Sequence, residues 1–269
     1  MVADRFRTRD LEFLAHKQEN AGISFAEYNA HKHHRDISAG GSHYSLGANL
    51  RDDSVKTGEE KARYYFKAMS LKPGNRVIDY GCGSLRIGGH FIRFLEPGGY
   101  YGLDVISGFY EIGAQLIGER LVREKQPRLA VISDDSVADA ERFEADHVFS
   151  AAVCVHVHPD ETQAYFHNLE RLAAKPGARL FFNAAVADEP IRFRYDSWAW
   201  PLSFYERALA KLDFVGASVG AEHEKEGHRV RYANLEFRRQ ARPSLRRTAR
   251  TGLAGLGGVL GRLRLPRTG

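Results

Sequence analysis

One stretch, VIDYGCGSLRIG at residues 77–88, limits the folds open to this chain more than any other. A short apolar run ends in Asp79, and Gly81 and Gly83 follow it. Glycines permit backbone angles that a β-carbon forbids, and they let a ligand approach the main chain closely. Apolar residues then recur on one helical face: Leu85, Phe91, Ile92 and Leu95. We therefore expect a strand, a glycine turn and a helix whose free amides face a nucleotide-like ligand.

Two side chains distinguish between the ligands that such a turn can hold. A dinucleotide fingerprint places a small residue at position 86, where this chain has Arg86. Asp79 stands two residues before the first glycine, where its charge would repel a pyrophosphate. A carboxylate there suits S-adenosylmethionine (SAM), which carries an ammonium group, a sulfonium and no phosphate. A NAD(P)-dependent oxidoreductase is therefore the less favoured alternative.

Three further apolar runs end in polar residues along the chain. Residues 100–104 form a predicted strand that ends in Asp104, which can accept the hydroxyls of a ribose. Residues 129–132 form the next predicted strand, and Asp134 or Asp135 after it can bind the amine of adenine. Residues 146–150 form a fourth. Open α/β sheets bind ligands beyond the carboxyl ends of their strands, so these side chains predict one site.

Residues 76–186 resemble the class I SAM-dependent methyltransferases, particularly those that act on small molecules. The resemblance is carried by the acid-x-Gly-x-Gly of residues 79–83, Asp104, Asp134, the segment 149–156 and the Lys-Pro-Gly-Ala turn at 175–178. It implies an α/β fold with a Rossmann-like, doubly wound sheet and helices on both faces. The sheet is expected to be mostly parallel, with one antiparallel strand supplied by a terminal hairpin near residues 214–237.

The resemblance also implies roles for individual residues in SAM binding. Asp79 would hold the ammonium group directly or through water, and Gly81 and Gly83 would offer backbone contacts. Asp104 would bind the ribose hydroxyls, and Asp134 the adenine amine. The expected cofactor contacts are completed by three residues beside these motifs: Cys82, Val105 and Ser150.

His156 is the candidate catalytic residue, because it follows the fourth predicted strand at the rim of the cradle, the name we give to the strand, glycine turn and helix of residues 77–95. If the methyl acceptor is a hydroxyl, a base near neutral pKa helps to remove its proton. A structural histidine that bonds its own loop is the alternative. Val155 replaces an acid that often precedes this histidine in the family, and Ala151 and Ala152 replace larger residues, which leaves the acceptor open.

The domain organisation follows from shifts in composition. Residues 1–55 are predicted to form a helical N-terminal extension or lid, residues 56–239 the SAM-binding domain, and residues 240–269 a basic, disordered tail. His43 in the extension is a candidate for the acceptor pocket. Its neighbouring cluster His31-Lys32-His33-His34 lacks a recognised partner at ligand spacing, so we expect no metal.

An aromatic insertion at residues 188–201 contains both tryptophans of the chain. Because it follows the fifth predicted strand at the carboxyl edge, Tyr195, Trp198 and Trp200 are predicted to line the acceptor pocket. A surface loop anchored by its own aromatic side chains is the alternative.

Charge is distributed unevenly along the chain. Nine arginines and no acid lie from Arg238 onward; without them the formal charge of +5 becomes −4 for residues 1–237. This argues against a specific nucleic-acid groove on the catalytic domain, and we expect at most weak contact of the tail with an anionic membrane. The start of the chain has no apolar signal segment and no apolar run is long enough to span a membrane, so we expect a cytoplasmic protein.

Taken together, the sequence predicts a SAM-dependent methyltransferase that methylates a small molecule, at oxygen. The alternative from a different class is a noncatalytic protein that binds SAM or serves as a partner subunit. The identity of the acceptor is left open.

Overall fold

The computed structural model describes residues 6–38, 53–225 and 227–241 of the 269-residue chain. His43 and the predicted tail from residue 242 onward lie outside these ranges. The helices are α1 (Arg7–Glu19), α2 (Phe25–Ser38), α3 (Asp53–Met69), α4 (Gly88–Phe94), α5 (Ser107–Ile117), α6 (Glu119–Lys125), α7 (Asp134–Arg142), α8 (Thr162–Leu172) and α9 (Leu202–Ala208). Two short 3-10 helices are η3 (Cys154–His156) and η4 (Pro159–Glu161).

Seven strands of the described residues form one sheet in the order β3-β2-β1-β4-β5-β9-β8. These strands are β1 (Val77–Tyr80), β2 (Tyr100–Asp104), β3 (Arg128–Val131), β4 (His147–Ser150), β5 (Arg179–Val186), β8 (Asp213–Lys225) and β9 (His228–Arg238). The first five pair in parallel, and β9 is antiparallel to both β5 and β8. The predicted doubly wound sheet with an antiparallel terminal hairpin is confirmed. Its order reverses between β1 and β4, which is where such sheets bind ligands.

Helices cover both faces of the sheet. Consecutive strand residues point to opposite sides, so each face carries apolar side chains that the helices bury. On one face, Val77, Phe149 and Phe181 pack with the inner sides of α3 and α4. On the other, Ile78 and Leu180 pack with α7, α8 and α9. Strands buried on both faces are the reason why the parallel part of the sheet reads as nearly continuous apolar runs.

The prediction that a helix opens directly after the glycine turn was wrong. Helix α4 begins at Gly88, so the stretch around Leu85 is loop, with Leu85 at φ +55°. After β2 the chain forms two helices, α5 and α6, which are separated at Gly118, whose φ is +96°. Within residues 188–201, β6 (Ile191–Arg194) and β7 (Ser197–Ala199) form a two-stranded hairpin.

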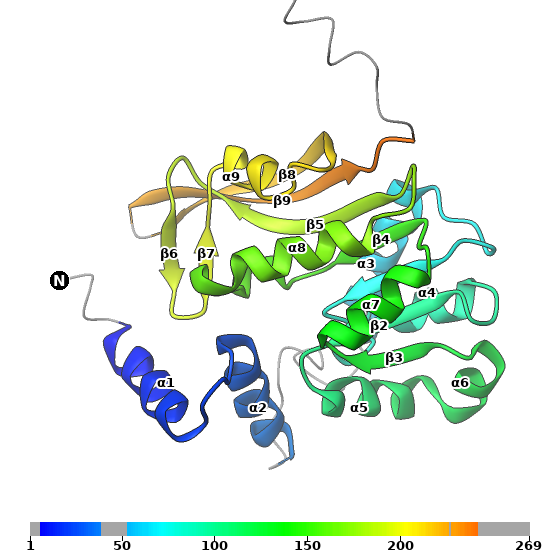
Figure 1. The fold of residues 1–269 in the computed structure, drawn as a ribbon, viewed down its shortest axis with the longest axis horizontal. Coiled ribbons are helices and arrows are strands. Elements are labelled where there is room, and N and C mark those ends of the chain that lie inside the picture. Colours follow the sequence, from blue (N-terminus) through cyan, green and yellow to red (C-terminus); the bar gives the residue numbers. More distant parts are fainter. Residues whose placement is uncertain (1–5, 39–52, 226, 242–269) are drawn as a thin grey trace, which may run out of the picture.

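The pair α1–α2 lies beside the β6–β7 hairpin at one end and near α5 at the other (Figure 1). Phe25 and Tyr28 of α2 form a buried cluster with Phe13 of α1 and Trp198 of β7. One helical turn further along α2, Ala30 packs with residues at the end of β2 and the start of α5. The described part of the N-terminal extension therefore bridges two regions at the carboxyl edge of the sheet.

Arg239, just after β9, anchors the end of the terminal hairpin. Its guanidinium donates to the carbonyl oxygens of Ala173 (3.0 Å), Glu170 (2.6 Å) and Lys211 (3.1 Å), which ties the end of α8 to the sheet. We expect Arg239→Ala to lower the free energy of unfolding by about 2 kcal/mol, because three carbonyl oxygens, two of them in partly buried hydrogen bonds, lose a charged donor. Arg238→Ala, at an exposed neighbour, is the control and should change it by less than about 0.5 kcal/mol. Urea denaturation measures both, and equal effects would contradict this role.

Candidate functional site

The glycine loop after β1 is held against the end of β2. The backbone amides of Gly81 and Cys82 both donate to the carbonyl oxygen of Leu103, at 2.7 and 3.0 Å. Gly81 and Gly83 adopt φ values of +88° and +53°, which favour glycine. This part of the sequence prediction is confirmed by the backbone angles, and the loop is longer than expected because α4 starts only at Gly88.

The two glycines have different surroundings. A β-carbon on Gly81 would lie 2.3 Å from Cγ2 of Val153, so the segment after β4 packs directly on the loop at that point. A β-carbon on Gly83 would meet no atom of the described residues within 4 Å. The main chain at Gly83 therefore borders open space.

Asp104 joins the loop to the end of β2. One carboxylate oxygen accepts from the amide of Gly83 at 2.7 Å, and the other accepts from the amide of Val105 at 2.9 Å. The side chain is 6% exposed. Burial raises the pKa of Asp104 from 3.8 to about 6, against the opposing effect of its backbone hydrogen bonds. A carboxylate can accept about four hydrogen bonds, so acceptor capacity is left over.

Asp79 lies beneath the loop on the α4 side of β1 and is only 3% exposed. It accepts a 2.7 Å hydrogen bond from the hydroxyl of Tyr100. A β-carbon on Gly88 would lie 2.1 Å from that hydroxyl, so the first residue of α4 must be small for this pair to form. Burial raises the pKa of Asp79 from 3.8 to about 8, the Tyr100 hydrogen bond lowers it, and the charge of Asp104 raises it further.

The two raised pKa values have a consequence for stability. The folded protein holds protons on Asp79 and Asp104 that the unfolded chain releases near its ordinary pKa of 3.8. Their contribution to stability is therefore full below about pH 4. It is lost as the pH rises through about 6 for Asp104 and about 8 for Asp79.

The remaining predicted cofactor residues differ in where they lie. Asp134 is exposed in the first turn of α7, which Ser133 caps, at the carboxyl end of β3. Val105 is partly buried and packs beside Ile106 at the end of β2. Cys82 is buried, and its burial raises the pKa of the thiol well above the ordinary value. The Cys82 side chain therefore contributes to the packing of the core.

Ser150 does not offer its side chain to a ligand. It is 0% exposed. Its hydroxyl donates to the carbonyl oxygen of Tyr80 at 2.6 Å and accepts from the hydroxyl of Tyr165 at 2.8 Å. The prediction that Ser150 contacts the cofactor is therefore wrong for its side chain. In β4 this side chain points into the core under α8 and cannot reach a ligand.

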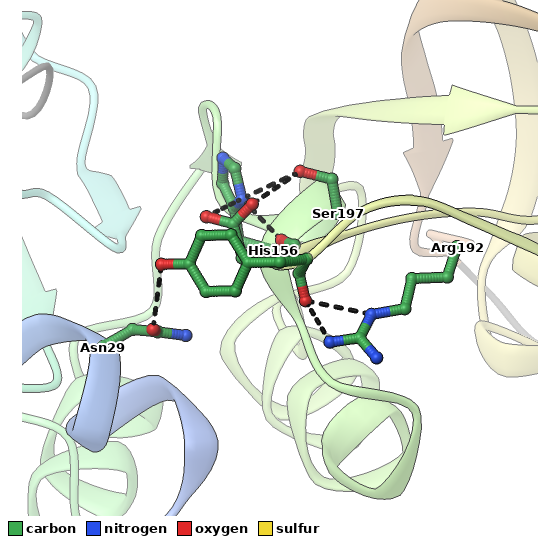
Figure 2. Close-up of polar contacts among 6 residues, drawn as sticks. Asn29, His156, Arg192 and Ser197 are labelled. Atoms are coloured by element: carbon green, nitrogen blue, oxygen red, sulfur yellow. Dashed lines mark hydrogen bonds and ion pairs between the residues drawn. The ribbon is translucent and has the colours of Figure 1, made fainter. Parts of the chain in front are cut away.

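His156 ends η3, which follows β4, and its ring is half exposed. Its Nδ1 lies 2.8 Å from the backbone oxygen of Asp196, 3.5 Å from Oγ of Ser197 and 3.6 Å from a carboxylate oxygen of Asp196. In Figure 2 the other ring nitrogen points away from these groups. Asp196 and Ser197 begin the return of the β6–β7 hairpin, and no local sequence pattern paired them with His156.

The three aromatic residues predicted for the acceptor pocket are separated. Tyr195 is half-buried, and its hydroxyl donates to Oδ1 of Asn29 on α2 at 3.3 Å (Figure 2). Trp198 is buried beneath α1 and α2, with the ring of Phe25 at 5.5 Å. Trp200 stacks on Phe204 of α9 at 4.3 Å. The prediction that the two tryptophans line the acceptor pocket is therefore corrected for Trp198, whose ring is buried by α1 and α2, and stays a prediction for the partly exposed Trp200.

Polar contacts fasten α1 and α2 over this region. Arg192 of β6 forms a bidentate pair with Asp10 of α1, at 2.8 and 2.9 Å. Glu161 accepts from the first backbone amides of α2, those of Phe25 and Ala26. An acid at a helix N-terminus is favourable because it satisfies free amides and complements the helix dipole.

Sequence reasoning missed one unusual backbone position beside the site. Ala152, after β4, has φ +61°, and its amide donates to the side-chain oxygen of Asn183 on β5. Non-glycine residues with such angles concentrate at functional sites. Nothing in the local composition indicates it, because the partner lies 31 residues away.

The fold matches solved structures, although no protein-family model and no curated protein matches the sequence. The magnesium protoporphyrin IX methyltransferase ChlM of Synechocystis PCC 6803, solved with bound SAM, has a TM-score of 0.54 and 16% identity, covering 82% of this chain and 100% of its own. The 4+2 cyclase SpnF has a TM-score of 0.56 and 15% identity, covering 77% and 92%. The N-terminal domain of EvdMO1, solved with S-adenosylhomocysteine (SAH) bound, has a TM-score of 0.51 and 16% identity, covering 74% and 86%.

These likenesses show that the chain has a Rossmann-like methyltransferase fold, so the resemblance predicted from the sequence is confirmed at the level of the fold. No helix among the described residues combines the length and apolar character needed to cross a membrane. In the same part of the chain, no group of three or more His, Cys, Asp and Glu side chains is placed to hold a metal ion.

The contrast between the two loop glycines can be tested without a ligand. We expect Gly81→Ala to lower the free energy of unfolding by about 3 kcal/mol, because it adds a clash with Val153 to an unfavourable φ. Gly83→Ala should cost only about 1 kcal/mol, since its new methyl group meets open space.

A double-mutant cycle supplies the control. Adding Val153→Ala to Gly81→Ala should recover part of the loss, whereas adding it to Gly83→Ala should be additive. Equal destabilisation by the two glycine substitutions in urea denaturation would contradict the packing of Val153 on Gly81.

Proposed function

We propose that this protein is a SAM-dependent methyltransferase that methylates a small molecule at oxygen. The observation that carries the proposal is the pair of buried acids, Asp79 and Asp104, of which Asp104 bonds the amide of Gly83, where the main chain borders open space. Within residues 6–38, 53–225 and 227–241, the groups that bond these two acids are a tyrosine hydroxyl and backbone amides, which are neutral. Two buried acids bonded by neutral groups favour a ligand that brings positive charge.

The residues of the cradle fit SAM better than a dinucleotide. When bound, SAM supplies an electrophilic methyl group on a sulfonium. Asp104 would accept the ribose hydroxyls with the acceptor capacity it has left, and Asp79 would hold the ammonium group directly or through water. Asp134, exposed at the carboxyl end of β3, would bind the adenine amine. A pyrophosphate would instead be repelled by the charge of Asp104 and would bring no cation to Asp79.

The acceptor would approach from the side of the β6–β7 hairpin. His156 lies one 3-10 turn after Val153, which packs on the glycine loop, so it stands next to the cradle. We assign it as the base that takes the proton of an acceptor hydroxyl. Helices α1 and α2, fastened through Asp10 and Glu161, would act as the lid of this pocket and limit its size to a small molecule.

A noncatalytic SAM-binding protein is the second candidate. It is favoured by the burial of Trp198 and the stacking of Trp200, which remove two aromatic surfaces from the acceptor side. The neighbour SpnF is named a cyclase rather than a methyltransferase. SAH release on a panel of phenols and hydroxy acids separates the two: accumulation beyond one equivalent indicates an enzyme.

Calorimetric titration tests the cofactor. We expect micromolar binding of SAM and SAH, and no binding of NADH or NADPH at the same concentrations. Asp104→Ala should weaken SAM binding more than tenfold, because it removes the ribose acceptor. Glu119→Ala, at an exposed acid on α6, is the control and should leave affinity within about twofold. Binding of a nicotinamide cofactor instead would refute the assignment.

Proton release provides a separate test of Asp79. With a pKa of about 8, Asp79 is mostly protonated at pH 7 before the ligand binds. A nearby ammonium group lowers the pKa of a carboxyl by about 1–3 units, so SAM binding should release about half a proton or more. Titrations at pH 7 in buffers of different ionisation enthalpy measure this number. Asp79→Asn should abolish the release, and proton uptake by the wild type would contradict the role.

A further inference from the structure

We infer that Asp196, in the turn between β6 and β7, is the positioning residue for His156. In this inference the backbone oxygen of Asp196 sets the tautomer of the ring, and its carboxylate stabilises the ring after proton uptake. The inference rests on the proposed function, because it concerns the residue assigned there as the base.

The geometry around the ring determines which nitrogen carries the proton. Nδ1 of His156 lies 2.8 Å from the backbone oxygen of Asp196 (Figure 2). A carbonyl oxygen can only accept, so Nδ1 is the donor in this contact. In a neutral imidazole the other nitrogen then has a free electron pair. The hairpin thus leaves Nε2 ready to receive a proton.

The carboxylate of Asp196 adds a charge to the same side of the ring. One of its oxygens lies 3.6 Å from Nδ1, and the other accepts a 3.1 Å hydrogen bond from Ser197. The Asp196 side chain is 20% exposed, so solvent screens its charge only in part. When an acceptor hydroxyl gave its proton to Nε2, the oxygen would keep the O–H electron pair and use it to bond the methyl carbon, while the bond from that carbon to sulfur would break with its electrons left on sulfur. The ring would then be a cation facing this carboxylate.

The turn that carries Asp196 is held by a local contact of Arg192 and by a long-range ion pair of the same side chain. Arg192 donates to the backbone oxygen of Tyr195 at 2.9 Å and pairs with Asp10 of α1. Ser197 is buried next to Asp196. These contacts fix the turn relative to η3, so the carbonyl and the carboxylate reach His156 from a defined direction.

A second His–Asp pair in the same segment provides a matched control. His158 and Asp160 lie two and four residues beyond His156, with Nδ1 to carboxylate oxygen at 3.7 Å. The side chain of Asp160 is 86% exposed, so solvent screens that pair almost completely. Asp160→Asn therefore removes a carboxylate at similar distance from a histidine without touching the proposed base.

The first experiment is long-range proton–nitrogen NMR on the full chain, with the signals of His156 assigned by their absence in His156→Gln. We expect the neutral ring to carry its proton on Nδ1, both in the wild type and in Asp196→Asn, which keeps the backbone carbonyl. A neutral ring protonated on Nε2 would overturn the inference. This measurement needs neither SAM nor an acceptor, so its failure leaves the calorimetric test of the proposed function untouched.

The second experiment measures turnover with the best acceptor from the panel of phenols and hydroxy acids. Asp196→Asn should lower kcat about tenfold or more, while KM and the Kd for SAM stay within about twofold, because the charge is needed only after proton transfer. Asp160→Asn should leave all three constants unchanged. An undiminished kcat in Asp196→Asn, or an equal loss in Asp160→Asn, would overturn the role of the carboxylate.

Discussion

The hydrogen bond between the carboxylate of Asp104 and the amide of Gly83 is the contact on which the arrangement of the site depends. It joins the end of β2 to the loop after β1, two segments that the parallel register already brings to the same edge. Because the acceptor is a buried charge, losing this bond would leave a costly unpaired group. The main chain of the loop is thus held open at Gly83, and Gly81 is closed by Val153.

Buried acids are the reason why we propose a cationic ligand for this site. Asp79 and Asp104 both have raised pKa values, chiefly because burial disfavours their charged forms. A protein that keeps two such groups gives up stability as the pH approaches neutrality. A positively charged ligand offsets that cost, which connects the folding of the chain with the ligand it is proposed to bind.

The acceptor side is built differently, from segments far apart in the chain. Arg192 reaches Asp10 across 182 positions, and Glu161 reaches the start of α2 across 136. These contacts bring the N-terminal helices over the β6–β7 hairpin. The ring of Trp198 packs against the helices, and the polar groups of Asp196 lie beside His156.

The sequence by itself determined the sheet, the glycine loop and the acids Asp79 and Asp104, because these depend on local order: apolar runs, glycines and strand ends in succession. It also indicated His156 from its place after β4. Only the tertiary structure decided that Ser150 faces the core, that Trp198 is covered, and that Asp196 approaches His156. Those outcomes depend on which face of a strand is buried and on contacts across 40 or more residues, which no local pattern encodes.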